Sequence, residues 1–551
     1  MSTTGPTTTG GTTQSGGLGA RFMEPAATIE FDLIVVGGGI TGCWATLLAA
    51  QRGLRVCLVE ADDFGSGASR VSHRILHGGF RYLQSLDLPR LRESVVERRH
   101  YFREFPELVR PLHCLMPLYG KGLKRPGAMR AAAWTYASLA ADQNSGVGAA
   151  LRLPRGGVVS PARTRELFEK VRSDGLLGSG VWHDGLMRSH ARVTMTILRR
   201  AAALGAIGLN HTPATALLTE GGRVAGVRVE HAGLPREIRA PRVLNTAGTD
   251  AGRWAPELED GDGRLVNPAM AFNLMLDRPP VSTHGVAVDP PTPERDGETR
   301  TYFLVPRSGR IAAGTTHRPV EPDSQGLSGD GLGVTNGLIQ RMLDDLNAAV
   351  PGLDVTHRDV MRVDAGLVPA DEPGRDEPSD RPIVRDHGKL GGPIGLATAV
   401  TVKYTTARHT AARGLDTLLG SRSQGSRSQG SPSPGSNRSF PEVQTEIPLE
   451  LLLNPEPSAD DLVAQSRSIL ALCEAEGVSS LTDLVLGRTE WGEIPSHALG
   501  LAEPLAELLG SQYDWDAARK RLELESLAHA LPGSLPKIGE ELTTLGEDSA
   551  P

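Results

Sequence analysis

The sequence FDLIVVGGGITGCWATLLAAQRGLRVCLVE, residues 31–60, decides the fold of this 551-residue chain. It opens with an apolar run over Leu33–Val36, which is typical of a buried strand. Three glycines follow in the spacing G-x-G-x-x-G, and the residues after them keep helical spacing up to a break at Gly53. A second apolar run over Val56–Val59 ends in Glu60. The stretch therefore predicts a strand–turn–helix–strand unit.

Each position of the turn requires glycine for a different physical reason. Gly37 permits the tight turn, Gly39 lets a pyrophosphate approach the backbone, and Gly42 lets the helix lie close on the strand. The helix N-terminus offers free N–H groups and a positive dipole end to phosphates. Glu60 can accept hydrogen bonds from both ribose hydroxyls, and it repels the extra phosphate of NADP. We therefore predict a dinucleotide site for FAD or NAD.

The composition excludes several classes of protein. The 39% of hydrophobic residues can bury a sizeable core, and the net charge of −7 argues against a nucleic-acid partner. No C-x-x-C spacing occurs among the cysteines, so we predict neither a metal site nor a disulfide framework. No apolar run is long enough to span a bilayer. We expect a cytoplasmic protein and leave open a peripheral contact with the inner face of the membrane.

Segments of biased composition suggest the domain boundaries. Residues 1–30 are rich in Thr, Gly and Ser and are predicted to form a disordered tail rather than a signal peptide. Residues 421–440 contain SRSQG twice and are interpreted as a low-complexity linker. The linker separates the main body, residues 31–420, from a helical C-terminal domain over 441–531. Residues 532–551 are interpreted as a second tail.

Two further segments carry residues that suit a ligand. HGGFRYL, residues 77–83, combines a Gly-Gly pair with polar side chains, although an exposed turn fits equally well. VKYTTAR, residues 402–408, runs from a strand into a helix and can present backbone N–H groups. Gly248 follows small residues at a strand end, where a cofactor could pass.

Two charged segments can be interpreted as surface structure or as functional features. Residues 87–109 indicate a charged helix with a mostly solvated face. Basic residues at 121–130 then precede an apolar stretch that contains Trp134. A basic cluster beside an amphipathic helix can rest on an anionic membrane, whereas a surface helix with a packed aromatic pair is the simpler interpretation.

In their order along the chain, these motifs resemble the FAD-dependent glycerol-3-phosphate dehydrogenases of the D-amino-acid-oxidase-like flavoprotein superfamily. The matching segments are the glycine turn, HGGFRYL (77–83), GTT (314–316), RD (385–386) and VKYTTAR (402–408). LVLGRTEWG, residues 484–492, resembles a degraded form of the signature of that family's C-terminal domain. The resemblance implies an α/β fold with a Rossmann-like FAD-binding domain, an interleaved β-sheet-rich substrate domain and a helical C-terminal domain.

The resemblance also implies which residues hold FAD and the substrate. The ADP half of FAD would lie on the glycine turn and Glu60. The remaining cofactor-binding candidates are Ser69, Arg74, His77, Gly78, Gly79, Gly248, Lys403, Tyr404 and Thr405. The candidates for the substrate side are Arg81, Tyr82, Arg385 and Lys403, with His77, His317 or a lysine of lowered pKa as the base.

The family pattern is broken at three places on the substrate side. Val368 stands where the family has an arginine in Gly-Val-Arg-Pro-Leu. Thr401-Val402 replaces a Gly-Gly pair, and residues 271–273 replace Gly-Ser-His. Losing one arginine removes a charge-assisted contact worth roughly 1.5–3 kcal/mol.

Three functions remain open at this point. The first is oxidation of a secondary alcohol on a small anionic substrate, most directly glycerol 3-phosphate, with electrons passing from FAD to a quinone or another acceptor. The second is oxidation of an amine or amino acid within the same superfamily. The third is a flavin-binding protein whose catalysis has decayed.

Overall fold

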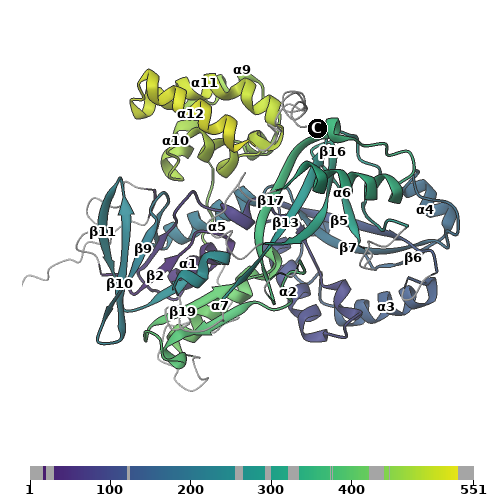
Figure 1. The fold of residues 1–551 in the computed structure, drawn as a ribbon, viewed down its shortest axis with the longest axis horizontal. Coiled ribbons are helices and arrows are strands. Elements are labelled where there is room, and N and C mark those ends of the chain that lie inside the picture. Colours follow the sequence, from purple (N-terminus) through teal and green to yellow (C-terminus); the bar gives the residue numbers. More distant parts are fainter. Residues whose placement is uncertain are drawn as a thin grey trace, which may run out of the picture.

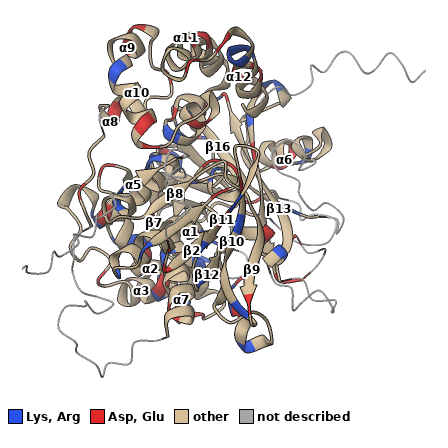
Figure 2. Ribbon diagram, turned by 90° about the vertical axis from the view of Figure 1, so that its left-hand side faces the viewer, with Lys and Arg blue, Asp and Glu red and all other residues tan. Residues whose placement is uncertain are grey.

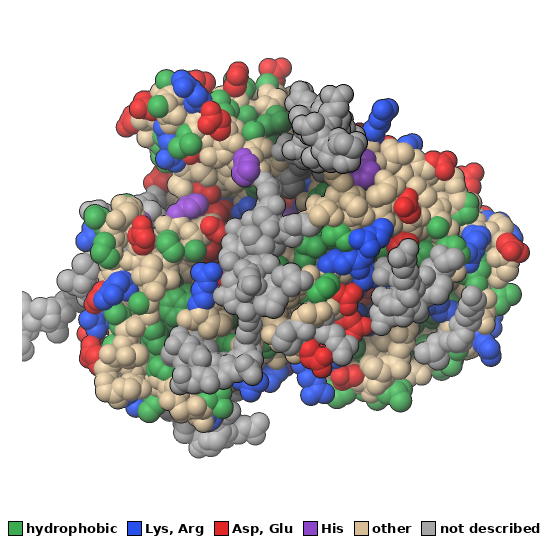
Figure 3. Space-filling view, in the orientation of Figure 1, with side chains coloured by type: hydrophobic (Ala, Val, Ile, Leu, Met, Phe, Trp, Pro, Cys, Tyr) green, Lys and Arg blue, Asp and Glu red, His purple; other side chains and the backbone are tan. Residues whose placement is uncertain are grey.

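The computed structural model describes residues 17–19, 30–120, 124–254, 265–291, 300–320, 334–372, 374, 376–420, 440–445 and 447–531. Residues 421–439 of the predicted linker, and the predicted tail at 532–551, lie outside the described residues. An α/β part, a β-sheet part and a helical lobe make up the fold (Figure 1, Figure 3). The predicted α/β class with a helical C-terminal domain is confirmed.

The α/β part is built on a seven-stranded sheet in the order β1–β8–β3–β2–β12–β19–β18. Its strands are Gly17–Leu18 (β1), Leu33–Val36 (β2), Val56–Val59 (β3), Ile207–Leu209 (β8), Val243–Asn245 (β12), Ile383–Asp386 (β18) and Leu396–Val400 (β19). Neighbouring strands are parallel except for the edge strand β18, which is antiparallel to β19. The predicted strand–turn–helix–strand unit therefore lies at the centre of the sheet.

Both faces of this sheet are covered, because β2 alternates its side chains between two cores. Leu33 and Val35 pack with the helices Ile40–Gln51 (α1), His190–Ala203 (α5) and Ala407–Leu419 (α7). Ile34 and Val36 pack against a three-stranded meander on the other face. The meander consists of Ala214–Glu220 (β9), Arg223–His231 (β10) and Leu234–Arg239 (β11).

Strand β1 differs from the expected disordered tail. Gly17 and Leu18 pair in parallel with β8 at the sheet edge, and Leu18 is buried in the core beneath α1 and α5. A two-residue strand in a Thr/Gly/Ser-rich stretch gives no periodic signal, so the sequence could not predict it.

The second part is a nine-stranded sheet in the order β17–β13–β16–β15–β14–β5–β7–β4, with β6 paired to β7. Its strands are Ile75–Leu76 (β4), Val109–Pro117 (β5), Gly157–Val159 (β6), Ser179–Met187 (β7), Asn267–Leu276 (β13), Gly285–Val288 (β14), Tyr302–Arg307 (β15), Arg310–Pro319 (β16) and Val360–Ala370 (β17). The associated helices are Leu88–Glu104 (α2), Pro126–Leu139 (α3), Pro161–Leu167 (α4) and Asn336–Ala349 (α6). Strands of the two sheets alternate along the chain, so each sheet is assembled from segments that lie far apart in the sequence.

The helical lobe packs on both other parts through charged residues that are fully buried. It contains Leu449–Leu453 (α8), Ala459–Ala464 (α9), Ser466–Ala475 (α10), a π-helix over Asp483–Arg488, Pro495–Tyr513 (α11) and Ala517–Ala530 (α12). Figure 2 shows charged residues of both signs where α10 approaches α5. Arg192 of α5 forms a bidentate pair with Glu476 at 2.7 and 2.8 Å. Within the described residues, no helix combines the length and apolar character needed to span a bilayer.

One pair at this junction makes stability depend on pH. His211 Nε2 lies 3.1 Å from Asp483, and this hydrogen bond raises the pKa of His211. The hydrogen bond therefore makes its full contribution to the free energy of unfolding below the pKa of His211 in the unfolded chain, about 6.5. This contribution is lost as pH rises through the pKa of His211 in the folded protein. We expect the free energy of unfolding to fall over that window by no more than about 1 kcal/mol, because His211 is half exposed. The thermal midpoint should fall with it. Thermal melts of the wild type and His211→Gln should converge at high pH, and parallel curves at every pH would contradict the expectation.

Candidate active site

The glycine turn has the close packing that its motif predicts. Gly37 has φ +99°, and a Cβ there would meet the Thr246 backbone at 2.8 Å. A Cβ on Gly42 would lie 1.9 Å from the Gly37 carbonyl oxygen, so only glycine lets α1 approach β2 this closely. Gly39 precedes α1 and faces the Ser69 hydroxyl, whose oxygen accepts a hydrogen bond from Ile40 N–H at 3.0 Å.

Glu60 lies beside this turn at the end of β3. Its carboxylate accepts hydrogen bonds from the N–H groups of Gly38 at 2.5 Å and Asp62 at 2.8 Å. Burial outweighs these two bonds and raises the pKa of Glu60 to about 7. A Cβ on Gly38 would meet Glu60 Cβ at 2.9 Å, so the middle glycine is also required, which the sequence analysis missed.

Two motifs that are far apart in the sequence meet beside Tyr82. His77 N–H, in HGGFRYL, donates to Thr405 Oγ1 at 3.1 Å. The Lys403 ammonium contacts the Tyr82 hydroxyl and lies 4.4 Å from the centre of the Tyr82 ring. Residues 77–83 and 402–408 therefore lie in direct contact, and the shared site that the resemblance implies stays a prediction.

Lys403 lies in a cationic cluster. The guanidinium of Arg90 is 4.6 Å from the Tyr82 ring, and that of Arg81 is 5.8 Å away. Asp380 pairs with Arg90 at 3.2 Å and with Arg81 at 3.5 Å. Burial, followed by the charges of Arg81 and Arg90, lowers the pKa of Lys403 to about 7. Lys403 can therefore lose a proton near neutral pH.

Asp184 on β7 organises the HGGFRYL segment and was not among the predicted residues. Its carboxylate accepts hydrogen bonds from Gly78 N–H at 2.6 Å and from Arg98 at 3.0 Å, and it lies 3.3 Å from His77 Nδ1. Burial raises its pKa, but the contacts with His77, Arg98 and Gly78 prevail and lower it to about 2. A lone acid inside an otherwise buried strand was the signal that could have identified it.

The Gly-Gly pair of this segment serves packing. A Cβ on Gly78 would lie 2.1 Å from the Arg98 guanidinium, and one on Gly79, which has φ +78°, would lie 2.9 Å from Ser94 Cβ. These two faces are filled by protein. A ligand can therefore approach Gly78 and Gly79 only from another side.

Three predicted residues lie outside the Lys403 cluster. Arg74 is buried and pairs with Glu490 at 2.5 Å and Glu493 at 3.0 Å, both in the helical lobe, and its place along the cofactor stays a prediction. Arg385 lies on β18 opposite Thr398 with an exposed side chain, and no contact with Lys403 is found within the described ranges. His317 lies on β16, where burial, followed by the charge of Arg300, lowers its pKa to about 4.

The other predicted cofactor residues lie near the turn or the cluster. Gly248 opens a short 3-10 helix, two residues after Thr246, whose hydroxyl donates to the Gly37 carbonyl at 2.8 Å. Tyr404 directs its hydroxyl to the His190 carbonyl of α5 at 3.3 Å, so only its backbone remains for a ligand. Thr405 is buried against His77.

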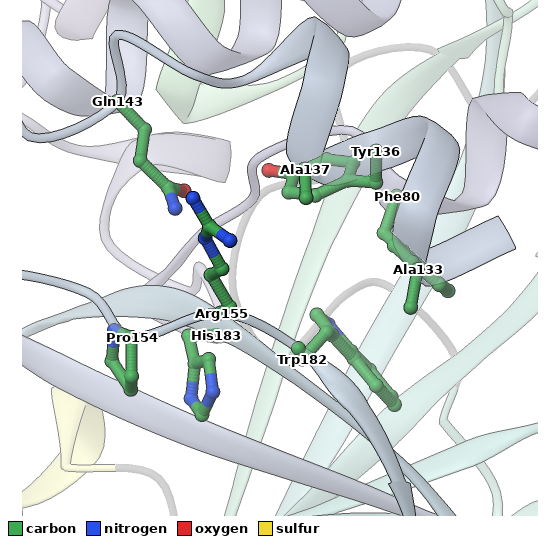
Figure 4. A pocket seen from close by; sticks show the side chains of 10 residues that line it. Phe80, Ala133, Tyr136, Ala137, Gln143, Pro154, Arg155, Trp182 and His183 are labelled. Atoms are coloured by element: carbon green, nitrogen blue, oxygen red, sulfur yellow. The ribbon is translucent and has the colours of Figure 1, made fainter. Parts of the chain in front are cut away.

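A cavity lies behind the HGGFRYL segment, between α3 and β7. Figure 4 shows the aromatic side chains Phe80, Tyr136 and Trp182 on one side and Gln143, Arg155 and His183 on the other. Phe80 and Trp182 are stacked with ring centroids 5.7 Å apart. The cavity measures about 10 Å³, which is room for about one water molecule, so it does not hold a substrate.

Comparison with known proteins identifies the family. The model of the FAD-dependent oxidoreductase family matches residues 32–400. The chain belongs to this family of FAD-dependent oxidoreductases. It is 31% identical over 404 residues to a glycerol-3-phosphate dehydrogenase of Mycobacterium leprae, with 72% of this chain and 64% of that protein covered. It is 34% identical to glycerol-3-phosphate dehydrogenase 1 of Mycobacterium bovis, with 69% and 71% covered.

A solved structure shows the same fold. The glycerol-3-phosphate dehydrogenase of Bacillus halodurans, complexed with FAD, superimposes with a TM-score of 0.66 at 19% identity, covering 93% of this chain and 96% of that one. The chain thus spans less than two thirds of the Mycobacterium leprae relative, but nearly the whole of the Bacillus structure.

The residues at and around the glycine turn fit FAD, the cofactor of this family. The packed glycine turn and buried Glu60 suit the ADP half. Ser72 Oγ is buried without a hydrogen-bond partner among the described residues, three positions after Ser69. A buried hydroxyl without a partner is costly, and a ligand oxygen would satisfy it. Lys403, Tyr404 and Thr405 begin the turn into α7 and would present backbone N–H groups to the flavin.

Affinity for FAD should depend on the protonation of Glu60. Because its pKa is about 7, the carboxylate that accepts ribose hydroxyls becomes protonated below neutrality. We expect FAD to bind more weakly as pH falls through 7, and Glu60→Gln to remove this dependence. Fluorescence titration of apoprotein with FAD measures both, with the exposed Glu220→Gln as control. A wild-type affinity that does not change with pH would contradict the assignment.

Proposed function

We propose that this FAD-dependent oxidoreductase dehydrogenates the secondary alcohol of a small anionic substrate, with glycerol 3-phosphate as the first candidate. The observation that carries the proposal is the contact between Lys403 and Tyr82, which joins two distant motifs into one cationic cluster. The curated relatives named glycerol-3-phosphate dehydrogenase support the choice of substrate.

The cluster divides into an anchor and a base. Arg81 is 70% exposed and only loosely paired with Asp380, so an incoming phosphate can replace that carboxylate. Arg–phosphate contacts are charge-assisted and can be bidentate. With the phosphate on Arg81 and Arg90, the hydroxyl-bearing carbon would lie toward Lys403 and Tyr82.

Lys403 is the best-matched base of the three candidates. A general base works best when its pKa lies near the operating pH, and that of Lys403 is about 7. His317, with a pKa of about 4, binds a proton too weakly, and His77 Nδ1 is engaged by Asp184. Neutral Lys403 accepts the hydroxyl proton, while the Tyr82 hydroxyl orients the substrate oxygen. Bound FAD supplies the hydride acceptor.

Amino-acid oxidation remains the second candidate because of Val368. This residue lies on β17 opposite Ala269, where a valine offers no charge to a phosphate. Anaerobic titration of the holoenzyme tests both functions by bleaching of the flavin absorbance. We expect glycerol 3-phosphate to bleach it and amino acids not to. The reverse result would assign the second function, and a flavin that no donor reduces would indicate decayed catalysis.

We also propose a quinone as the electron acceptor and a peripheral contact with the inner face of the cytoplasmic membrane. Support for the contact comes from α3, where Trp134 is 78% exposed and Arg125 and Arg130 are exposed nearby. Aromatic and basic side chains suit an anionic lipid interface. Co-sedimentation with anionic vesicles should fall in Trp134→Ala, and equal sedimentation of both proteins would overturn the contact.

A further inference from the structure

The C-terminal motif LVLGRTEWG places one arginine against the cofactor-binding part of the fold. Arg488 ends the π-helix and is fully buried. Its guanidinium forms a bidentate pair with Asp63 at 2.6 and 2.8 Å, and it also donates to the Glu476 carbonyl at 2.9 Å. A Cβ on Gly487 would lie 2.2 Å from Asp63 Oδ2, so the motif needs a glycine beside this arginine.

Asp63 belongs to a short loop, residues 60–63, that begins at the acid of the ribose site. Within this loop Asp62 N–H donates to Glu60 Oε1 at 2.8 Å. The strand end after β8 holds the loop from outside, because Thr212 N–H donates to the Glu60 carbonyl at 2.7 Å and His211 N–H to the Asp62 carbonyl at 2.8 Å. Asn210 Nδ2 bridges Asp63, at 3.0 Å, to Gly477 of the helical lobe, at 2.9 Å.

These contacts form a continuous path from the helical lobe to the carboxylate that faces the glycine turn. We propose that Arg488 is a positioning residue for the adenosine end of FAD, which it orients through Asp63 and the loop that fixes Glu60. The proposal rests on the assigned role of Glu60 at the ribose. The lobe is then part of the cofactor site, although none of its residues needs to touch FAD.

The energetics support a strong coupling. Removing one partner of a buried ion pair leaves an uncompensated charge, so loss of Asp63 or Arg488 forces the loop to rearrange. Any change in FAD affinity caused by docking of the lobe must be matched by an equal change in docking caused by FAD. FAD should therefore protect the contact between residues 60–63 and the lobe.

A matched pair of isosteric changes tests the path. Asp63→Asn and Asp364→Asn each weaken one buried bidentate pair with an arginine at the junction with the helical lobe, but only Asp63 belongs to the loop and contacts Arg488. We expect Asp63→Asn to raise the dissociation constant for FAD about tenfold, the size of one charge-assisted hydrogen bond. Asp364→Asn should lower the thermal midpoint to a similar extent without changing FAD affinity. Release of FAD from the holoenzyme, followed by flavin fluorescence, gives the readout.

A double variant distinguishes an effect on the position of Glu60 from general destabilisation of the protein. In Glu60→Gln, the added change Asp63→Asn should no longer alter FAD affinity, because its effect passes through Glu60. Arg488→Lys, which keeps the charge, serves if Asp63→Asn does not fold, and it should weaken FAD in the same way. Equal loss of FAD in Asp364→Asn, or an unchanged affinity in Asp63→Asn, would overturn the proposal. No substrate enters these measurements, so they fail or succeed independently of the proposed dehydrogenase activity.

Discussion

Replacing Lys403 by methionine should lower kcat/KM for glycerol 3-phosphate by about 10²–10⁴, the usual contribution of a general base. Methionine keeps the length and packing against Tyr82 but cannot accept the hydroxyl proton. FAD content should remain at the wild-type level, because the ammonium contacts Tyr82 and not the glycine turn. Steady-state kinetics of the purified holoenzyme measure the loss.

The dependence of kcat/KM on pH tests whether Lys403 acts as a base or as a cation. Burial and the neighbouring arginines lower the pKa of Lys403 to about 7, and only the neutral amine can act as a base. The wild-type kcat/KM should therefore rise as pH increases through 7, and this limb should be absent in Lys403→Met. A profile that falls through 7 would mean that Lys403 acts as a cation. Lys389→Met, at a largely exposed lysine paired with Asp386, is the matched control.

Replacing Gly42 by alanine should abolish retention of FAD. The new Cβ would lie 1.9 Å from the Gly37 carbonyl oxygen, so α1 must move away from β2 or the turn must open. Overpacking that forces the backbone to shift costs about 1–3 kcal/mol and occasionally more. The measurements are flavin absorbance of the purified protein and its denaturation midpoint in urea.

A suitable control for this change is Gly500→Ala in α11. A Cβ there meets nothing within 4 Å, and alanine favours a helix interior. We expect this variant to keep its flavin and to be as stable as the wild type or slightly more so. A yellow, stable Gly42→Ala protein would show that the turn does not hold the cofactor.

The sequence predicted those parts of the fold that local rules determine. The glycine spacing between two apolar runs was enough to predict β2, α1 and β3, since each glycine is required by atoms within the same unit. The proximity of residues 77–83 to residues 402–408 came only from the resemblance, because no local rule connects segments so far apart. The structure now shows that contact directly.

Long-range charge pairing set the limit of the prediction. The ion pair of Arg74 could not be predicted, because its partner Glu490 lies 416 residues away in another part of the fold. Helix α2 was interpreted as mostly solvated, whereas Glu97 and Arg98 are buried and paired with Arg408 and Asp184. A charged residue gives the same sequence signal whether its partner is water or a distant side chain.

The order of strands in the central sheet has a consequence for how the protein is made. Strand β12 lies between β2 and β19, so neighbours in the sheet come from opposite ends of the main body of the chain. Sheets built from such non-local pairings form slowly. During translation the glycine turn emerges from the ribosome long before Lys403. Strand β12 therefore lacks its partner β19 until residues 396–400 have been made. Until β19 is made, we expect one edge of β12 to remain unpaired, and such an edge is prone to misassembly.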